Sequence, residues 1–582
     1  METVDEDSGV PEQARQIALT GSYVRRFYFP LLLLSSLKKT FQKTQSLRMP
    51  DVETAPSNPF KSFVNKLGHI CDSCKGGKTV TSFAILQHGT IQYYFTSNNR
   101  DEEDYQRTSH YVAGILEVLG KAQDDEIRGS ISRLGSLPIS LRLLRSIVEF
   151  NQSRIKGYIG RISETLDTCI NSTRMDQTDD GKEMLCSLQY LKPILDSDIV
   201  DHKRGTMEAF IDGSIRAIKA IFRINTPSFK EYLRLRTHNN TDRTAPWVVL
   251  SHSIGRLLSY YYAINILLTA RRNWPQLFVD FSITFFPSTT PRAINLPRNK
   301  LSANHIINNM TSDAEKRLLY QKYALELENS GFPLNTTISS TCNFKPFVHA
   351  EVNLLDHLLR LPDGPPQFFL NDRYIGTSKP TCRLCECYFM FHPSGVQVRE
   401  GHKNLYIPWR TPDVYDKTKA QGRNKILDQI IPVVREEVFL NLREKFSSQR
   451  PNDSWDTPSN VPPEMQGSVY GGSVYGGSVS VGRRAVTDFG SVSGRREVDT
   501  MSMWGEVGDE LAAQMGMVSI HEGEDDKEEG EGLVWEETPR VARRERDDGS
   551  VRESLTQTPE LTEGSTGEED DGDDNEGGGA LL

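Results

Sequence analysis

The sequence predicts an α+β protein in which a largely helical N-terminal region precedes an α/β/α domain with a mixed sheet and a long disordered C-terminal tail. Three observations support this prediction. Apolar residues recur at three- and four-residue intervals up to about residue 330, which is typical of amphipathic helices. Strand-like and helix-like stretches then alternate up to Phe446, which indicates a packed α/β sheet. The remaining chain is too polar to bury the apolar surface that would offset the entropy of ordering it.

The first part, residues 1–57, is expected to be a flexible segment because it is mostly polar and is interrupted by prolines. It contains one apolar run, FYFPLLLLSSL, at residues 27–37. This run is too short to cross a bilayer and includes Pro30, so we expect it to be buried or to bind a partner. A targeting role is the remaining alternative.

The second part, residues 58–330, is predicted to be a mostly helical domain with an early β-hairpin. The hairpin is expected within residues 79–97, where two β-rich runs are separated by His88-Gly89. The apolar stretch 257–270 is too short to span a membrane and contains Asn265, which favours a buried helix.

The third part, residues 331–446, is predicted to form the α/β/α domain. After a β-branched, polar stretch, the pattern predicts a helix that begins near Val348, a strand within residues 367–378, a short helix at 382–392, strand material at 396–409 and a closing helix at 424–446.

The fourth part, residues 447–582, is predicted to be a disordered tail, first rich in glycine and serine and then acidic. Residues 521–582 contain 22 acidic and 6 basic side chains, a net charge of −16, so the formal net charge of −10 leaves +6 for residues 1–520. We expect the acidic end to keep the tail solvated, and binding to basic partners is the alternative.

Four residues in the third part have the pattern of a catalytic metal site: His349, Glu351, Cys382 and Cys385. One imidazole and two thiolates suit zinc, and a catalytic zinc ion has three protein ligands and an open position for water. Because Cys382 and Cys385 are three residues apart, their sulfurs face the same side of a helix. The thiolate form of each cysteine is favoured over the thiol if the cysteines lie at the N-terminal end of that helix, where the helix dipole is positive. We therefore predict that His349, Cys382 and Cys385 bind one zinc ion per chain.

Glu351 is the predicted catalytic residue. It follows His349 by two positions, about 200° around an ideal helix, so we expect it to approach the bound water rather than the metal. A carboxylate there can take the water's proton and return it to a leaving amine. Together with zinc, this is the chemistry of nucleobase deamination.

H-x-E followed by C-x-x-C resembles the signature of the cytidine-deaminase-like superfamily. The surrounding PFVHAEVNLL and YIGTSKPTCRLC resemble the OTT-like deaminases, a branch expanded in fungal genomes, over roughly residues 340–415. This resemblance implies a mixed five-stranded sheet layered between helices, His349, Cys382 and Cys385 as zinc ligands, and Glu351 as proton shuttle. The superfamily usually places proline directly before the first cysteine, whereas Thr381 intervenes here, so no substrate-binding loop is carried over.

Two further thiols and two aromatic residues leave alternatives open around this site. Cys342 or Cys387 could complete a closed, structural zinc site, although a buried thiol is the preferred interpretation of each. Tyr406 and Trp409 could stack on a flipped base, although packing in the core is preferred.

His69, Cys71 and Cys74 form a second partial ligand set, HICDSC, that lacks a visible fourth partner. Metal binding there is the less favoured hypothesis, because the segment has the pattern of a helix that leads into the hairpin.

The resulting prediction is a zinc-dependent deaminase of a nucleobase in a nucleotide or nucleic acid. The alternative is a non-catalytic interaction protein with a structural zinc site, which binds protein partners through its helical region and acidic tail. Nucleic-acid binding without catalysis is a third option. The net charge of only +6 over residues 1–520 gives it little support. Eight cysteines in 582 residues are too few for a disulfide scaffold, so we expect an intracellular protein of the cytoplasm or nucleus, without a membrane anchor.

Overall fold

The computed structural model describes residues 16–42, 58–132, 138–196, 206–238, 242, 244–362, 364–401 and 403–444. The predicted tail at 447–582 lies outside these residues. Within them, no helix combines the length and the apolarity needed to cross a membrane.

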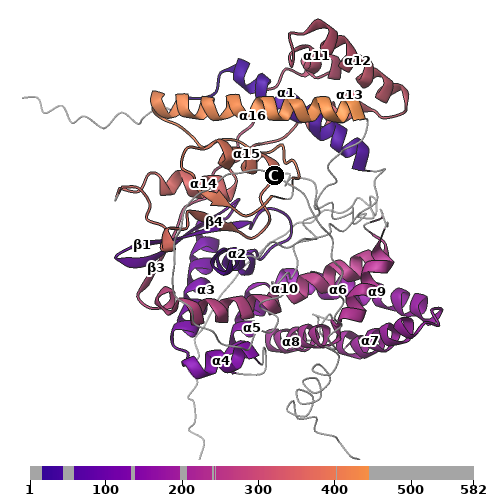
Figure 1. The fold of residues 1–582 in the computed structure, drawn as a ribbon, viewed down its shortest axis with the longest axis vertical. Helices are drawn as coiled ribbons and strands as arrows, with labels where there is room; N and C mark the ends of the chain where they lie inside the picture. Colours follow the sequence, from indigo (N-terminus) through magenta and orange to yellow (C-terminus); the bar gives the residue numbers. More distant parts are fainter. Residues whose placement is uncertain are drawn as a thin grey trace, which may run out of the picture. The chain divides into compact units, whose positions relative to one another are not determined.

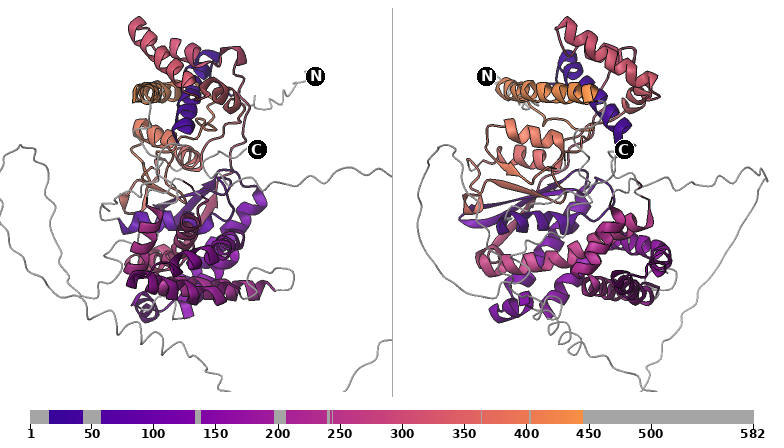
Figure 2. Two further views of the ribbon diagram at one scale, coloured as in Figure 1. Left: turned by 90° about the vertical axis from the view of Figure 1, so that its right-hand side faces the viewer. Right: turned by 45° about the vertical axis from the view of Figure 1, so that its right-hand side comes forward.

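A mixed sheet of five strands lies between two sets of helices (Figures 1 and 2). Its strand order is β3-β2-β1-β4-β5. β1 is antiparallel to both β2 and β4, whereas β2 pairs with β3 and β4 pairs with β5 in parallel. The strands are β1 Thr81–His88, β2 Thr90–Ser97, β3 Phe281–Phe285, β4 Tyr374–Thr377 and β5 Gln397–Val398. The mixed five-stranded sheet and the α+β class confirm the prediction.

The predicted hairpin is present as β1 and β2, and it lies at the centre of this sheet. The two strands pair in register, with Phe83 opposite Phe95, and Gly89 makes the turn at φ 77°, a conformation that favours glycine. The sheet therefore crosses the expected boundary at residue 330, because β1, β2 and β3 precede it and β4 and β5 follow it.

Both faces of the hairpin are buried, each in a different hydrophobic core. Side chains alternate between the faces of a strand, so Phe83 and Ile85 pack into one core while Ala84 and Leu86 pack into the other. This burial on both sides explains why the strands form a nearly continuous apolar run rather than a polar and apolar alternation.

The first core is formed by the helical region, as predicted. Its helices contact one another and, through α2 and α3, the sheet. They are α2 Pro59–Cys71, α3 Glu102–Gly120, α4 Asp124–Ser132, α5 Pro138–Phe150, α6 Gln152–Arg174, α7 Asp179–Asp196, α8 Met207–Ile224, α9 Pro227–Thr237 and α10 Pro246–Asn273. α10, which contains the apolar stretch 257–270, is a buried helix in contact with most of the others.

The second core lies on the opposite face of the sheet and is formed by α14, α15, α16 and α1, with α11 to α13 beside them. These helices are α1 Gly21–Gln42, α11 Ala303–Asn308, α12 Ala314–Asn329, α13 Leu334–Thr341, α14 Ala350–Leu358, α15 Arg383–Phe391 and α16 Lys417–Glu444. The β-branched stretch before Val348 is thus helical in α13, and the strand material at 396–409 contributes the two residues of β5.

Helix α1 differs from the expectation that residues 1–57 are flexible. Its four consecutive leucines, residues 31–34, are all fully buried, because α16, α13 and α11 surround the helix. A helix that is apolar on all sides is a buried helix, and Pro30 is accommodated within it. The apolar run at residues 27–37 was expected to be buried or to bind a partner, and it is buried within the chain, but a helix of this length was not predicted there.

We predict that α1 contributes strongly to the stability of the second core. Leu33→Ala should lower the free energy of unfolding by about 2–5 kcal/mol, because it removes fully buried methyl groups and leaves a cavity. Leu318→Ala, at a side chain that is 66% exposed on α12, is the matched control and should change it by less than about 0.5 kcal/mol. Urea midpoints measure both. Equal midpoints for the two variants would show that α1 does not pack as described.

Candidate metal site

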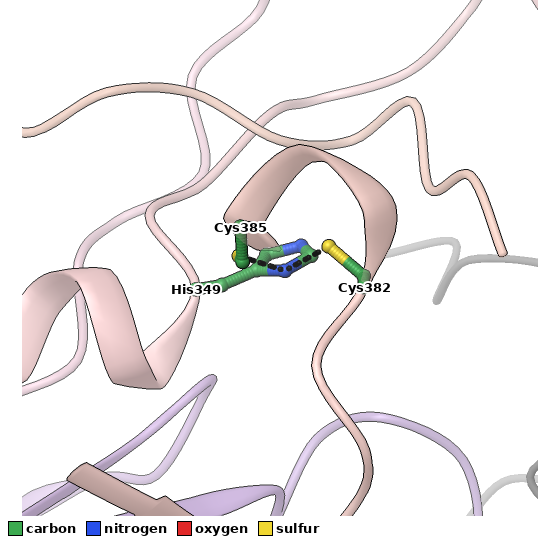
Figure 3. A group of neighbouring side chains, drawn as sticks. All are labelled: His349, Cys382 and Cys385. Atoms are coloured by element: carbon green, nitrogen blue, oxygen red, sulfur yellow. Dashed lines mark hydrogen bonds between the residues drawn. The ribbon is translucent and has the colours of Figure 1, made fainter. Parts of the chain in front are cut away.

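Three side chains from the starts of two helices in the third segment converge in the second core (Figure 3). The Nδ1 atom of His349 lies 3.4 Å from the Sγ atom of Cys382 and 3.4 Å from the Sγ atom of Cys385. The three ligand atoms all lie within 4.8 Å of one another, and the three residues are buried. We call this set the metal group.

The spacing of the metal group is compatible with a metal ion at its centre. Bonds of about 2.3 Å to sulfur and about 2.1 Å to nitrogen at tetrahedral angles place a sulfur and a nitrogen about 3.6 Å apart. The observed separations of 3.4 Å are close to this value. The donor set therefore needs little rearrangement to hold such an ion.

Two helix N-termini position these ligands. His349 is the residue that precedes α14, and Cys382 is the residue that precedes α15, each with an extended backbone. Cys385 lies in the first turn of α15, so both sulfurs are near the positive end of that helix. The start of α14 is fixed by Asn98, whose side-chain oxygen accepts from the Ala350 N–H at 2.9 Å.

The segment that follows β5 supports the metal group from one side. The His349 ring hydrogen-bonds the backbone carbonyl of Pro408. The indole Nε1 of Trp409 donates to the Cys385 sulfur at 3.1 Å. A histidine ligand commonly donates its second ring nitrogen in this way, which fixes the orientation of the first.

Helix α1 contacts the segment after β5 that supports the metal group, and the sequence did not predict this contact. The Tyr28 hydroxyl donates to the carbonyl oxygen of Trp409 at 2.9 Å, and the Phe27 ring lies 5.7 Å from the Trp409 ring. The aromatic residues at the start of the apolar run were the available signal, but the sequence did not identify what they contact. Trp409 is fully buried, so it belongs to the core, as preferred.

Glu351 lies in the first turn of α14 and is 4% exposed. Burial raises the pKa of its carboxyl group, and the nearby charge of His349 partly opposes that shift. The carboxyl group also hydrogen-bonds Cys385. Glu351 is therefore adjacent to the metal group, where its carboxyl group can exchange a proton with a molecule bound there.

The pKa values of the three side chains in the metal group depend on one another. Burial acts to raise the pKa of the Cys382 thiol, but the hydrogen bond with Cys385 and the charge of His349 outweigh burial and lower it. Burial and the hydrogen bond with Cys382 raise the pKa of Cys385. Burial acts to lower the pKa of His349, but the Cys382 thiolate outweighs it and the net shift is upward. A metal ion would require both thiols to be deprotonated, so its binding would release protons.

The alternative ligands lie elsewhere. Cys387 is buried, and burial raises the pKa of its thiol to about 11. Cys342 is partly exposed and donates to the Ser339 carbonyl oxygen at 2.9 Å. The Tyr406 ring lies 6.4 Å from the His349 ring.

The set formed by His69, Cys71 and Cys74 does not converge. His69 instead hydrogen-bonds Ser259 at 2.8 Å and stacks on Tyr260. Within the part of the chain that the structure describes, the metal group is the one set of three such ligand atoms this close together.

Comparison with known proteins agrees with this geometry. The family model described as "OTT_1508_deam:-like deaminase" matches residues 348–413, which include the metal group and Glu351. No match was found among curated proteins or among solved structures. Residues 348–413 of this chain are therefore similar to OTT-like deaminases, and this similarity covers the metal group and Glu351.

Proposed function

We propose that this protein is a zinc-dependent hydrolytic deaminase that acts on a nucleobase within a nucleotide or a nucleic acid. The observation that supports the proposal most directly is the carboxyl group of Glu351 beside the metal group. The match of residues 348–413 to a deaminase family model supports it independently.

Zinc is the proposed ion because of the donor set. Thiolate and imidazole ligands together favour zinc over magnesium, calcium or manganese, which prefer oxygen. Three protein ligands are the number found in catalytic zinc sites, which keep one position for water. When bound, zinc lowers the pKa of a coordinated water molecule to about 7 and so supplies a nucleophile at neutral pH.

Glu351 performs the proton transfers in this proposal. Its carboxylate accepts a proton from the attacking water and donates it to the exocyclic amine, which then leaves as ammonia. Burial of the side chain excludes bulk water from this transfer and holds the carboxyl group next to the reacting atoms.

We predict that the purified full-length chain contains about one zinc ion, as a single three-ligand site requires. Cys385→Ser should lose this zinc, because the hydroxyl group is a poor substitute for a thiolate. Cys342→Ser and Cys387→Ser are the controls, since neither sulfur belongs to the metal group. Elemental analysis measures all four proteins. Zinc loss from either control would instead support a closed site with four protein ligands, which is the structural alternative.

We predict that Trp409→Phe weakens metal binding while the fold is kept. The substitution removes the N–H donor to Cys385 but leaves an aromatic ring in the core. Loss of a hydrogen bond to a metal ligand usually lowers metal affinity by about 10- to 100-fold. Competition with a zinc-binding dye measures the change, with Trp274→Phe in the first core as the control. Equal affinities for the two variants would show that the Trp409 donor does not support the metal group.

We predict that Glu351→Gln keeps its zinc and loses ammonia release by at least about 100-fold, because glutamine retains the shape of the side chain but cannot carry the proton. Glu400→Gln, at an exposed position, is the control and should match the original protein. Ammonia is measured against a panel of nucleobases, nucleosides, nucleotides and short oligonucleotides. If a substrate is found and Glu351→Gln is fully active on it, Glu351 is not the proton shuttle.

A panel without any ammonia release, from a protein that does bind zinc, would favour the non-catalytic alternative. Zinc would then stabilise the second core without chemistry, and Glu351→Gln would leave every measured property except stability unchanged.

A further inference from the structure

The strand β3 lies at one edge of the sheet, and no strand of the described chain pairs with its outer side (Figure 1). On its inner side it pairs in parallel with β2. Its sequence, Phe-Ser-Ile-Thr-Phe at residues 281–285, contains no charged residue and no proline. Because charged residues and prolines are the usual means of keeping sheet edges from pairing with other chains, β3 presents an unprotected edge.

The backbone groups of three residues in β3 point to this open side. The N–H of Phe286, directly after β3, donates to the carbonyl oxygen of Phe95 in β2 at 2.9 Å. Backbone groups alternate between the two sides of a strand, so Phe281, Ile283 and Phe285 face away from β2. Within the described ranges, these outward groups have no hydrogen-bond partner. A row of such N–H and carbonyl groups is what an added strand can pair with.

A groove lies beside the open edge, on the face of the sheet that carries the first core. Its volume is about 570 Å³, and its lining includes Phe281 and Ile283 from β3 and Ser109, Ala113 and Glu117 from α3. The side chains of Ser109 and Ala113 are small, so they leave room between the helix and the strand. An added strand could therefore place apolar side chains in this groove while its backbone pairs with β3.

The sequence of β3 indicates which strand fits this edge. Its five residues are nearly the same in both directions, with Ile283 at the centre. An antiparallel second copy, related by a twofold axis at Ile283, would have its Phe285 opposite Phe281. Ser282 and Thr284 would lie opposite each other in the same way. Apolar residues would then meet on the face with the groove and hydroxyl groups on the other face, which favours this pairing.

We propose that two copies of this chain associate through their β3 strands, antiparallel and with Ile283 on the twofold axis. In this register each outward N–H donates to an outward carbonyl oxygen of the other copy. Asp280, just before β3, lies opposite Phe286 of the second copy, so the two Asp280 carboxylates do not face each other. Opposite residues of an antiparallel pair point to the same face, so both metal groups lie on one side of the joined sheet.

Light scattering of the full-length protein during gel filtration tests this proposal. The mass of the wild type should rise from one chain to two as its concentration is raised through the micromolar range. Ser282→Lys together with Thr284→Lys should weaken this association roughly tenfold or more, because each lysine would face a lysine of the other copy. Both side chains are exposed, so the double variant should keep its fold.

Thr336→Lys together with Ser340→Lys is the matched control. These residues are exposed on α13, so the same charge is added away from β3. The control should associate within about twofold of the wild type, as expected of distant substitutions. Mixing the β3 lysine variant with Ser282→Glu, Thr284→Glu should restore a dimer that neither forms alone, because opposite charges then face each other.

Oxidative cross-linking tests the position of the axis. A residue on the axis meets its own counterpart, so Ile283→Cys should form a covalent dimer. Cα atoms in such a pair lie about 5.5 Å apart, which a disulfide can bridge. Ser282→Cys is the control, because its counterpart would lie beyond the limit of about 7 Å. The wild type, with its exposed Cys186, gives the background.

Three outcomes would overturn the proposal. The first is a wild type that stays a single chain throughout this concentration range. The second is equal association of the β3 lysine variant and the α13 control, which would place any contact on another surface or indicate general charge repulsion. The third is cross-linking through Ser282→Cys in preference to Ile283→Cys. None of these measurements depends on the metal or on ammonia release, so their outcome is separate from that of the proposed deaminase activity.

Discussion

The pairing of the β1–β2 hairpin with β4 is the constraint on which the rest of the structure depends. Ser82 and Phe83 pair with Thr377 and Gly376, so strands far apart in the chain form one continuous sheet. Because both faces of the hairpin are buried, it belongs to two hydrophobic cores at once. The helical layer and the layer with the metal group therefore cannot separate without exposing apolar surface, at about 25 cal/mol for each Å².

The metal group depends on local geometry at two helix starts and on distant support. His349 and Cys382 precede α14 and α15, where the extended backbone turns their side chains toward each other. The segment that follows β5 then orients the ring of His349 and the sulfur of Cys385. α1 holds that segment through Tyr28, so a helix near the start of the described chain contributes to the rigidity of the site.

The sequence predicted those features that depend on short spacings. Each of the motifs H-x-E and C-x-x-C has a short spacing, and the structure brings His349, Cys382 and Cys385 together with Glu351 beside them. Contacts between distant segments could not be predicted: Tyr28 and Trp409 are 381 residues apart, and neither spacing nor periodicity links them. The strand β3 was missed because its five residues adjoin a long helical region. The apolar run of α1 was expected to be buried or to bind a partner, but its helical form and its contacts with α11, α13 and α16 were not predicted.

The extent of the family match has a structural consequence. Residues 348–413 contain β4 and β5, which comprise four and two residues, but not the strands that complete the sheet. Without β1, the β4 backbone would lose its antiparallel partner, and Ile375 would lose the hairpin side chains in its core. A two-stranded ribbon of this length is not stable in water. The deaminase-like signature is therefore carried by a segment whose sheet is completed by the hairpin at residues 81–97, and the helical region packs on that hairpin from the other side.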